Sequence, residues 1–280
     1  MNFHKSLIPY FLIPLILIAC EETEIRPESL ELAVVEGFLY ANSPVEDIHI
    51  SRMIPFGSDS TLNFAINDLS ISLNDGEQDY LLTASPGDSG YYHYSGSDLR
   101  IQEGTTYTLN FSFNGEEIRA ETQVPSPPSG MGISTPSVEV QQIDFDAIFS
   151  GGNRPNFNEI EPIEISWENS DQSYYYVLVE NIDSNPEDII VGELPFGRPN
   201  FNLITEPTEA STYILLPQTL EQFGTHRIVL FKVNAEYVDL YENASQDSRN
   251  LDEPLSNVEN GLGVFTSFNS DTLYLEVYKQ

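Results

Sequence analysis

The chain has 280 residues, of which 40% are hydrophobic and 11% aromatic, and this composition is typical of a globular protein rather than a disordered one. Asp and Glu number 44 against 11 Lys and Arg, so the net charge of −33 repels phosphate backbones and no nucleic-acid partner is expected. The single Cys excludes an intramolecular disulfide and a zinc site built from cysteines. At roughly 100–200 residues per domain, the length predicts two domains.

The first twenty residues have the pattern of a lipoprotein signal peptide. An apolar run from Leu7 to Ile18 is too short to span the roughly 30 Å of a bilayer core comfortably. It ends in Leu17-Ile18-Ala19-Cys20, which resembles the bacterial lipobox, where a signal peptidase cuts before a Cys that carries a diacylglycerol. We expect residues 1–19 to be removed and Cys20 to be lipidated, which anchors the protein to a membrane. The alternative is a free, buried Cys beside an uncleaved anchor.

The segment after the Cys is acidic. Glu21-Glu22-Thr23-Glu24 resembles the export signals of surface lipoproteins in the phylum Bacteroidota. We therefore expect the protein to lie on the outer membrane and to face the cell exterior, and a periplasm-facing position is the alternative. Residues 20–29 are predicted to form a tether, because Pro27 interrupts a segment without apolar periodicity.

Residues 30–124 are predicted to form a β-sandwich, because six or seven short strand patterns alternate with turn residues. In one of them, residues 69–73 place apolar and hydroxyl side chains on opposite faces and lead into Asn74-Asp75-Gly76, which is a strong hairpin signal. Gly104-Thr105-Thr106-Tyr107 resembles the tyrosine corner of immunoglobulin-like sandwiches, which gives Tyr107 a structural role.

Three prolines between residues 125 and 130 predict a linker over 125–134, and residues 135–280 are predicted to form a second sandwich. A strand that ends in Trp167, followed by a Tyr-rich strand over 174–179, resembles the second and third strands of fibronectin type III domains. An apolar stripe at helical spacing predicts one short helix over 235–245. The expected fold is all-β, with two tandem sandwiches of the immunoglobulin or fibronectin III type.

The C-terminal part carries a family resemblance. Residues 254–265, with the sequence PLSNVENGLGVF, resemble the closing motif of the domain-of-unknown-function 4249 family, and the lipobox and the residues around Tyr107 agree with it. The resemblance implies a Bacteroidota lipoprotein, often encoded beside a TonB-dependent outer-membrane transporter, with no known activity or ligand residues. We interpret Gly261 and Gly263 as structural, in a tight turn that leads into a buried strand.

The residues do not predict catalysis or a cofactor. His49, His93 and His226 lie in separate strand patterns without a second ligand at a metal-binding spacing, and no Gly-x-Ser-x-Gly or phosphate-binding loop is present. Calcium ligands are conceivable at Asp144 and Asp146 and in the loop 181–188, but neither segment matches an EF-hand, so we interpret both as solvated acidic loops. We expect no enzyme and no metal site.

Exposed aromatic residues are the candidates for contact with a glycan, a peptide or a protein. The loop 195–201 is the preferred candidate, because two aromatic residues and a rare cation share a turn-rich segment. Alternation in two tyrosine runs supplies further candidates. The candidate contact residues are Phe196, Arg198, Phe201, Tyr92, Tyr94 and Tyr175.

Two three-residue segments, Asp59-Ser60-Thr61 and Asp271-Thr272-Leu273, resemble the O-glycosylation motif of this phylum. The sequence as a whole predicts an accessory lipoprotein that docks on a TonB-dependent transporter through surface complementarity. The alternative is a structural or adhesive protein of the cell surface without a role in transport.

Overall fold

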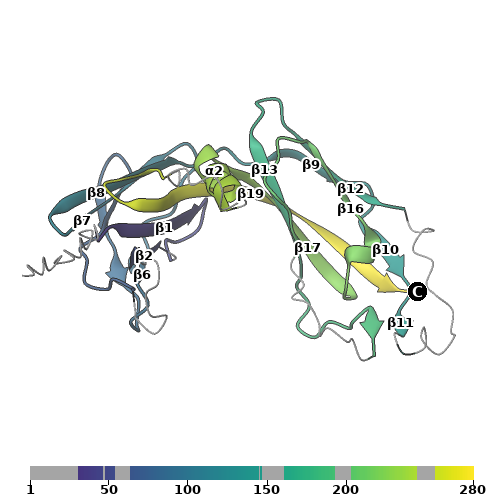
Figure 1. The fold of residues 1–280 in the computed structure, drawn as a ribbon. Coiled ribbons are helices and arrows are strands. Elements are labelled where there is room, and N and C mark those ends of the chain that lie inside the picture. The colour runs from purple at the N-terminus through teal and green to yellow at the C-terminus, as the bar shows by residue number, and fades with distance from the viewer. Residues whose placement is uncertain are drawn as a thin grey trace, which may run out of the picture. The chain divides into compact units, whose positions relative to one another are not determined.

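The computed structural model describes residues 31–46, 48–53, 64–144, 146, 161–192, 203–244 and 256–280 (Figure 1). Residues 31–280 form one compact unit. The lipobox, Cys20 and the predicted tether lie outside the described residues, as does Asp59-Ser60-Thr61. In the described part, no helix is both long enough and apolar enough to cross a membrane.

Strands form most of the described structure. The first half of the chain forms β1 (Ala33–Tyr40), β2 (Ile48–Arg52), β3 (Ser72–Asn74), β4 (Asp79–Leu81), β5 (Thr83–Ala84), β6 (Tyr91–His93), β7 (Thr106–Phe113) and β8 (Glu116–Gln123). The second half forms β9 (Ser129–Ile133), β10 (Ser137–Val140), β11 (Ile143–Asp144), β12 (Ile163–Glu168), β13 (Tyr174–Asn181), β14 (Ile190–Val191), β15 (Leu203–Ile204), β16 (Thr212–Leu215), the 3₁₀ turn η2 (Pro217–Thr219), β17 (Gly224–Val233), the predicted helix as α2 (Ala235–Ala244), β18 (Val258–Glu259) and β19 (Leu262–Lys279).

Nine strands form one sheet, in the order β15-β13-β17-β19-β1-β2-β6-β5, with β10 also paired to β19. A five-stranded sheet, β18-β8-β7-β3-β4, and a three-stranded sheet, β16-β12-β9, supply the second layers of two sandwiches. The predicted all-β fold with two tandem sandwiches is therefore confirmed.

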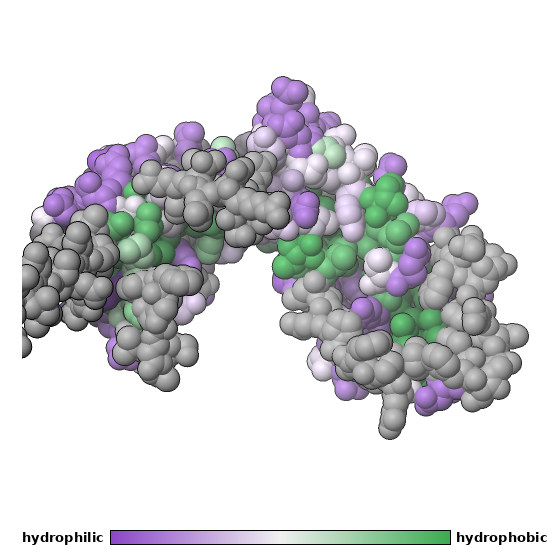
Figure 2. Space-filling view, viewed as in Figure 1, coloured by the Kyte–Doolittle hydropathy of each residue, from purple (hydrophilic) through white to green (hydrophobic). Residues whose placement is uncertain are grey.

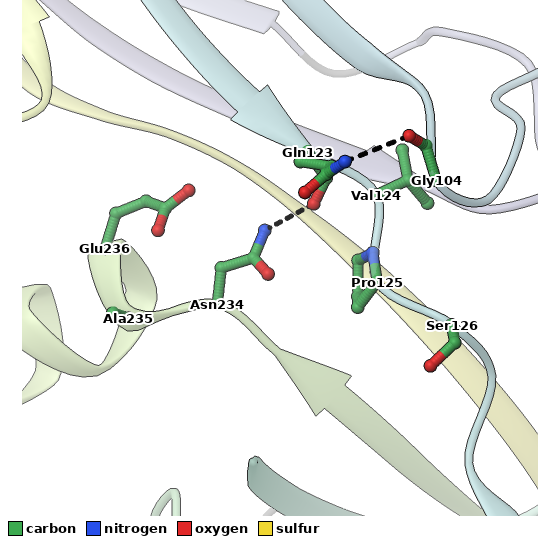
Figure 3. A pocket seen from close by; sticks show the side chains of 8 residues that line it. All are labelled: Gly104, Gln123, Val124, Pro125, Ser126, Asn234, Ala235 and Glu236. Carbon is green, nitrogen blue, oxygen red and sulfur yellow. Dashed lines mark hydrogen bonds between the residues drawn. The ribbon is translucent and has the colours of Figure 1, made fainter. Parts of the chain in front are cut away.

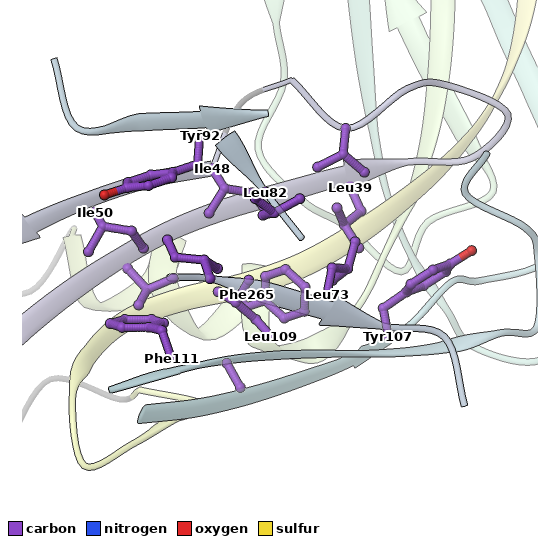
Figure 4. Close-up of a cluster of buried hydrophobic side chains, with 14 of the residues drawn as sticks. Leu39, Ile48, Ile50, Leu73, Leu82, Tyr92, Tyr107, Leu109, Phe111 and Phe265 are labelled. Carbon is purple, nitrogen blue, oxygen red and sulfur yellow. The ribbon is translucent and has the colours of Figure 1, made fainter. Parts of the chain in front are cut away.

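The first core lies between the nine-stranded sheet and the five-stranded sheet (Figure 4). Alternate residues of β1 and β2 meet alternate residues of β7, and all of them are almost fully buried. Phe265 of β19 lies among them with no exposed surface, although it comes from the other end of the chain. Burial of one such side chain stabilises the fold by about 1.5–3 kcal/mol.

The second core contains the inward residues of β12, β13 and β17 and the last inward residues of β19, Leu275 and Val277. Trp167 is 5% exposed and packs on Tyr175, with the ring centroids 5.7 Å apart. Trp167 is therefore part of the second core.

The predicted hairpin after Leu73 forms between β3 and β4, although β3 begins only at Ser72. The side chains of the turn explain its stability. Asn74 Oδ1 accepts the N–H of Gly76, and Asp75 Oδ1 accepts the N–H groups of Glu77 and Gln78. Such side-chain acceptors replace the missing backbone partners of a tight turn.

The expected domain boundaries stay predictions, because residues 31–280 form a single compact unit. Two features qualify them. β9 lies inside the expected linker and pairs with β12, since residues after Pro128 again have N–H groups to donate. Val258 and Phe265, which the sequence assigns to the second sandwich, belong to the first core.

The closing motif supplies hydrogen bonds to the edge of β19 that no strand covers. Asn257 Nδ2 donates to the carbonyl of Phe265 at 2.6 Å, and Asn257 Oδ1 accepts the N–H of Phe265 at 2.9 Å. Ser256 Oγ donates to the carbonyl of Gly263 at 3.0 Å. Asn260 has a φ of 59° and donates from its amide to the carbonyl of Glu117. Ser256 and Asn257 thus satisfy backbone groups of β19, whereas Asn260 ties the motif to β8.

Gly263 allows β19 to pair with β1. Its φ is +104°, and a Cβ atom at this position would overlap the carbonyl oxygen of Val35. Gly261 lies nearly as close to the first strand, because its Cβ would stand 3.0 Å from the carbonyl oxygen of Ala33. The two glycines therefore act in structure, as the sequence predicts.

We predict that Gly263→Ala lowers the free energy of unfolding by about 3 kcal/mol or more, because it combines a strained φ with a steric overlap on the β1 backbone. Gly76→Ala is the matched control: its φ is +92°, but a Cβ atom there meets nothing within 4 Å. It should cost only about 1 kcal/mol. Urea unfolding of both variants measures the difference. Equal losses would contradict the role given to Gly263.

Candidate binding surface

The nine-stranded sheet carries both cores on one of its faces, and its opposite face is rich in aromatic residues. The strand register defines this opposite face, because paired residues point to the same side and neighbours along a strand point to opposite sides. We define the aromatic face by these residues: Phe38, Tyr40, Tyr174, Tyr176, Leu178, Ile204, Val229, Phe231, Phe268 and Tyr274.

Rings from five elements, β1, β13, β17, β19 and α2, contact one another at the centre of the aromatic face. Tyr176 and Phe231 stack with centroids 4.7 Å apart, and Tyr40 stacks on Phe268 at 5.2 Å. Tyr237 of α2 meets the Phe268 ring edge-on at 5.0 Å. Each such pair contributes about 0.5–1.5 kcal/mol beyond its buried area. Burial among these rings raises the pKa of the Tyr176 hydroxyl well above its ordinary value.

Part of the aromatic face remains open to solvent. Tyr40 is 37% exposed, Ile204 is 61% exposed and Tyr274 is 54% exposed. Tyr274 lies opposite Arg227, whose guanidinium is paired with the carboxylate of Glu180. Large exposed apolar side chains on one face of a sheet are the usual mark of a contact surface.

A shallow hollow with a volume of about 380 Å³ lies where the chain leaves β8, beside the start of α2 (Figure 3). The Asn234 amide donates to the carbonyl of Gln123 at 2.9 Å and to Thr122 Oγ1 at 3.1 Å. Thr122 Oγ1 in turn donates to Glu236 Oε1 at 3.1 Å. The polar side chains here fasten the segment after β8 to β17 and α2, so we interpret the hollow as structural.

A buried lysine supports the same segment. Lys232 Nζ donates to Asp171 Oδ2 at 2.8 Å and to Ser126 Oγ at 3.4 Å, and it lies 5.7 Å from the centre of the Tyr175 ring. The hydrogen bond from Lys232 lowers the pKa of Asp171 to about 2. Asn269 Nδ2 donates to the carbonyl of Pro125 at 2.9 Å. Side chains of β17 and β19 therefore hold residues 125 and 126.

The structure corrects the choice of contact residues in the two tyrosine runs. Tyr92 has no exposed surface, donates to the carbonyl of Ile66 and accepts the N–H of Leu69. Tyr175 is 2% exposed and packs in the second core. In both runs the neighbouring tyrosines, Tyr91 and Tyr176, point the other way, because a shift of one residue changes the face.

The remaining predicted site residues have different positions. Tyr94 is half-buried and donates to Asp98 Oδ1 at 2.8 Å. Tyr107 donates to the carbonyl of Arg100 and accepts the N–H of Gln102, which are the hydrogen bonds expected of a tyrosine corner. Outside the described residues lie Phe196, Arg198 and Phe201, together with most of their loop.

The histidines and the calcium candidates lie apart in the described structure. His49 contacts Glu36 Oε2 at 3.3 Å, His93 contacts Ser85 Oγ at 2.9 Å, and His226 is buried beside the second core. In the loop 181–188, carboxylates accept from Thr225, Gln142 and Lys279, and Asp144 accepts the N–H of Asp146. No group of three or more possible ligands gathers among the residues searched, which are the described ones.

Tyr40, Phe231 and Tyr274 are not among the contact residues predicted from the sequence. One signal was present, because Tyr174–Val179 and residues 228–231 are continuous apolar runs instead of alternating ones. Such runs indicate strands with apolar side chains on both faces. The runs do not reveal that β17 lies between β13 and β19.

These features define a protein of two β-sandwiches joined through one sheet, with an aromatic face opposite its cores. A family model described as domain of unknown function DUF4249 matches residues 21–273, and the chain belongs to this family. No curated protein matches it. Among solved structures it is similar to domains A168–A170 of titin, at 10% identity and a TM-score of 0.20, over 88% of this chain and 67% of that chain. A score this low carries no argument.

We predict that His226 makes the fold sensitive to mild acid. Burial lowers the pKa of its imidazole, and the hydrogen bond to the Gly224 carbonyl opposes this effect. The unfolded chain, with a pKa of about 6.5, therefore binds more protons once the pH falls below that value. The contribution of neutral His226 to the free energy of unfolding is fully present above about pH 6.5. It is lost as the pH falls from there toward the lower pKa of the folded state.

The test compares the slope of unfolding free energy against pH for the wild type and His226→Gln. Between pH 7 and pH 5, the wild type should lose more stability than the variant, because only the wild type has a buried imidazole to protonate. Comparing slopes removes the constant cost of the substitution itself. Parallel curves would show that His226 does not titrate differently in the folded state.

Proposed function

We propose that this protein is a non-catalytic binding lipoprotein, anchored through Cys20 to the outer membrane and exposed at the cell surface. Its sandwiches dock on a TonB-dependent transporter and help to capture or hand over the substrate of that transporter. No covalent bond is made or broken in this role.

The observation that carries the proposal is the aromatic face. Tyr40, Ile204 and Tyr274 are large apolar residues with substantial exposure, and they lie on the side of the sheet that serves neither core. Side chains of this kind contribute to binding by loss of their water-accessible area and by close packing. The centre of this side is closed by α2, where Val233, Val238 and Phe268 form a third buried cluster, whereas Tyr40, Ile204 and Tyr274 stay exposed beside it.

Two features of the sequence support the membrane part of the proposal. The lone Cys stands directly after the apolar run, at the one position where lipid attachment requires a thiol. The residues that follow it are acidic and polar and provide a tether between the lipid and the folded part. At about 0.8 kcal/mol per buried methylene, two or three acyl chains anchor a protein firmly.

The experiment is a mild-detergent pull-down of the lipidated protein from its own membrane, followed by mass spectrometry. We predict that a TonB-dependent barrel is recovered in stoichiometric amount. Cys20→Ser should abolish the recovery, because the unanchored protein no longer reaches the membrane. Joint replacement of Phe196, Arg198 and Phe201 by Ser tests the loop as a contact, and Leu81→Ser, on an exposed position of β4, is its matched control.

Recovery of the protein alone, with full accessibility to protease on intact cells, would contradict the association with a transporter. It would favour a structural or adhesive protein of the cell surface instead. Loss of the barrel in the Leu81→Ser control would show that the effect of the loop replacement is not specific.

A further inference from the structure

We propose that the aromatic face is the docking surface, and that its occupant is a protein surface in which Lys and Arg side chains surround an apolar centre. This inference rests on the proposed binding function and adds to it the contact surface and the chemistry of the partner.

The apolar centre of the aromatic face extends across four adjacent strands. In one row of the register, Ile204 of β15 lies beside Leu178, then Val229, then Thr272 of β19. The next rows contain Tyr176 with Phe231 and Arg227 with Tyr274. Figure 2 shows hydrophobic residues gathered where Figure 1 labels β17. Val229 is buried in this area, and Ile204 and Tyr274 to either side of it are the exposed apolar side chains that a protein partner can contact.

The charges on this side of the sheet have one dominant sign. Among the described strand residues whose side chains lie on the aromatic face, Arg227 is the one Lys or Arg, and it is paired with Glu180. The other charged positions on this side are glutamates, namely Glu36, Glu139 and Glu276. The partner therefore meets an apolar centre with carboxylates at its border.

The cations elsewhere in the described structure do not change this balance. Four of them pair with carboxylates, as Arg52–Glu31, Arg119–Glu121, Lys232–Asp171 and Lys279–Glu187. Arg100 donates to the carbonyl of Asn42. With a net charge of −33 on the whole chain, a second copy would be repelled by the same surface. A basic partner is attracted, and its Lys and Arg side chains also bind the faces of exposed tyrosines.

The test places a photo-crosslinking residue, p-benzoylphenylalanine, at Ile204 or Tyr274 in the full lipidated protein and irradiates intact cells. Ile214 and Leu81 are the control positions, since they are 46% and 69% exposed on strands of the other sheets. We expect both test positions, and neither control, to form an adduct with the same protein. The crosslinked peptide should contain more Lys and Arg than Asp and Glu.

A charge substitution tests whether the partner is basic, separately from where on this protein it binds. Thr272 is half-buried on the aromatic face, so Thr272→Lys adds a cation there and Thr272→Glu adds an anion. With a basic partner, Thr272→Lys should lower the adduct yield about tenfold, whereas Thr272→Glu should not lower it. Ile214→Lys is the control for added charge on another surface and should leave the yield unchanged.

Three results would overturn the inference: adducts from the control positions only, adducts with a second copy of this chain, or a yield that rises with Thr272→Lys. If a barrel is still recovered in the pull-down while Ile204 and Tyr274 form no adduct, the assigned surface is wrong and the proposed function stands. If neither experiment recovers a partner, the proposed function itself fails.

Discussion

The double pairing of β19 is the constraint on which the rest of the structure depends. Its first residues run parallel to β1, and its later residues run antiparallel to β17 and parallel to β10. One strand therefore supplies Phe265 to the first core and Leu275 and Val277 to the second. Neither sandwich is complete without the last residues of the chain, and stability is expected to be shared between them.

The pairing of β19 also decides where polar side chains are needed to satisfy backbone hydrogen-bonding groups. On the side of β19 opposite β1, none of the described strands pairs with the backbone of Phe265, and the side-chain amide of Asn257 binds it instead. Between the two cores, Asn234, Asn269 and Lys232 bind the chain as it passes from β8 to β9. The three asparagines satisfy backbone groups that a strand or water would otherwise satisfy, and Lys232 binds the side chains of Ser126 and Asp171.

The same strand explains why the proposed binding surface lies on this side of the sheet. Because both second layers pack on one face of the nine-stranded sheet, the opposite face is free to carry aromatic residues such as Tyr176, Phe231 and Tyr274. The rings at its centre stabilise the sheet, and those at its border remain exposed. A single face thus combines a structural role with the contact that we propose.

The sequence by itself determined the class of fold, the hairpin at Asn74-Asp75-Gly76, the helix near 235–245 and the structural roles of Tyr107 and Gly263, because each depends on local periodicity or backbone geometry. It also placed the predicted lipid anchor at Cys20. Only the tertiary structure decided that Phe265 completes the first core and that Tyr92 and Tyr175 are buried. The physical reason is the register between strands that are distant in sequence: a shift of one residue exchanges the two faces, and no local pattern fixes it.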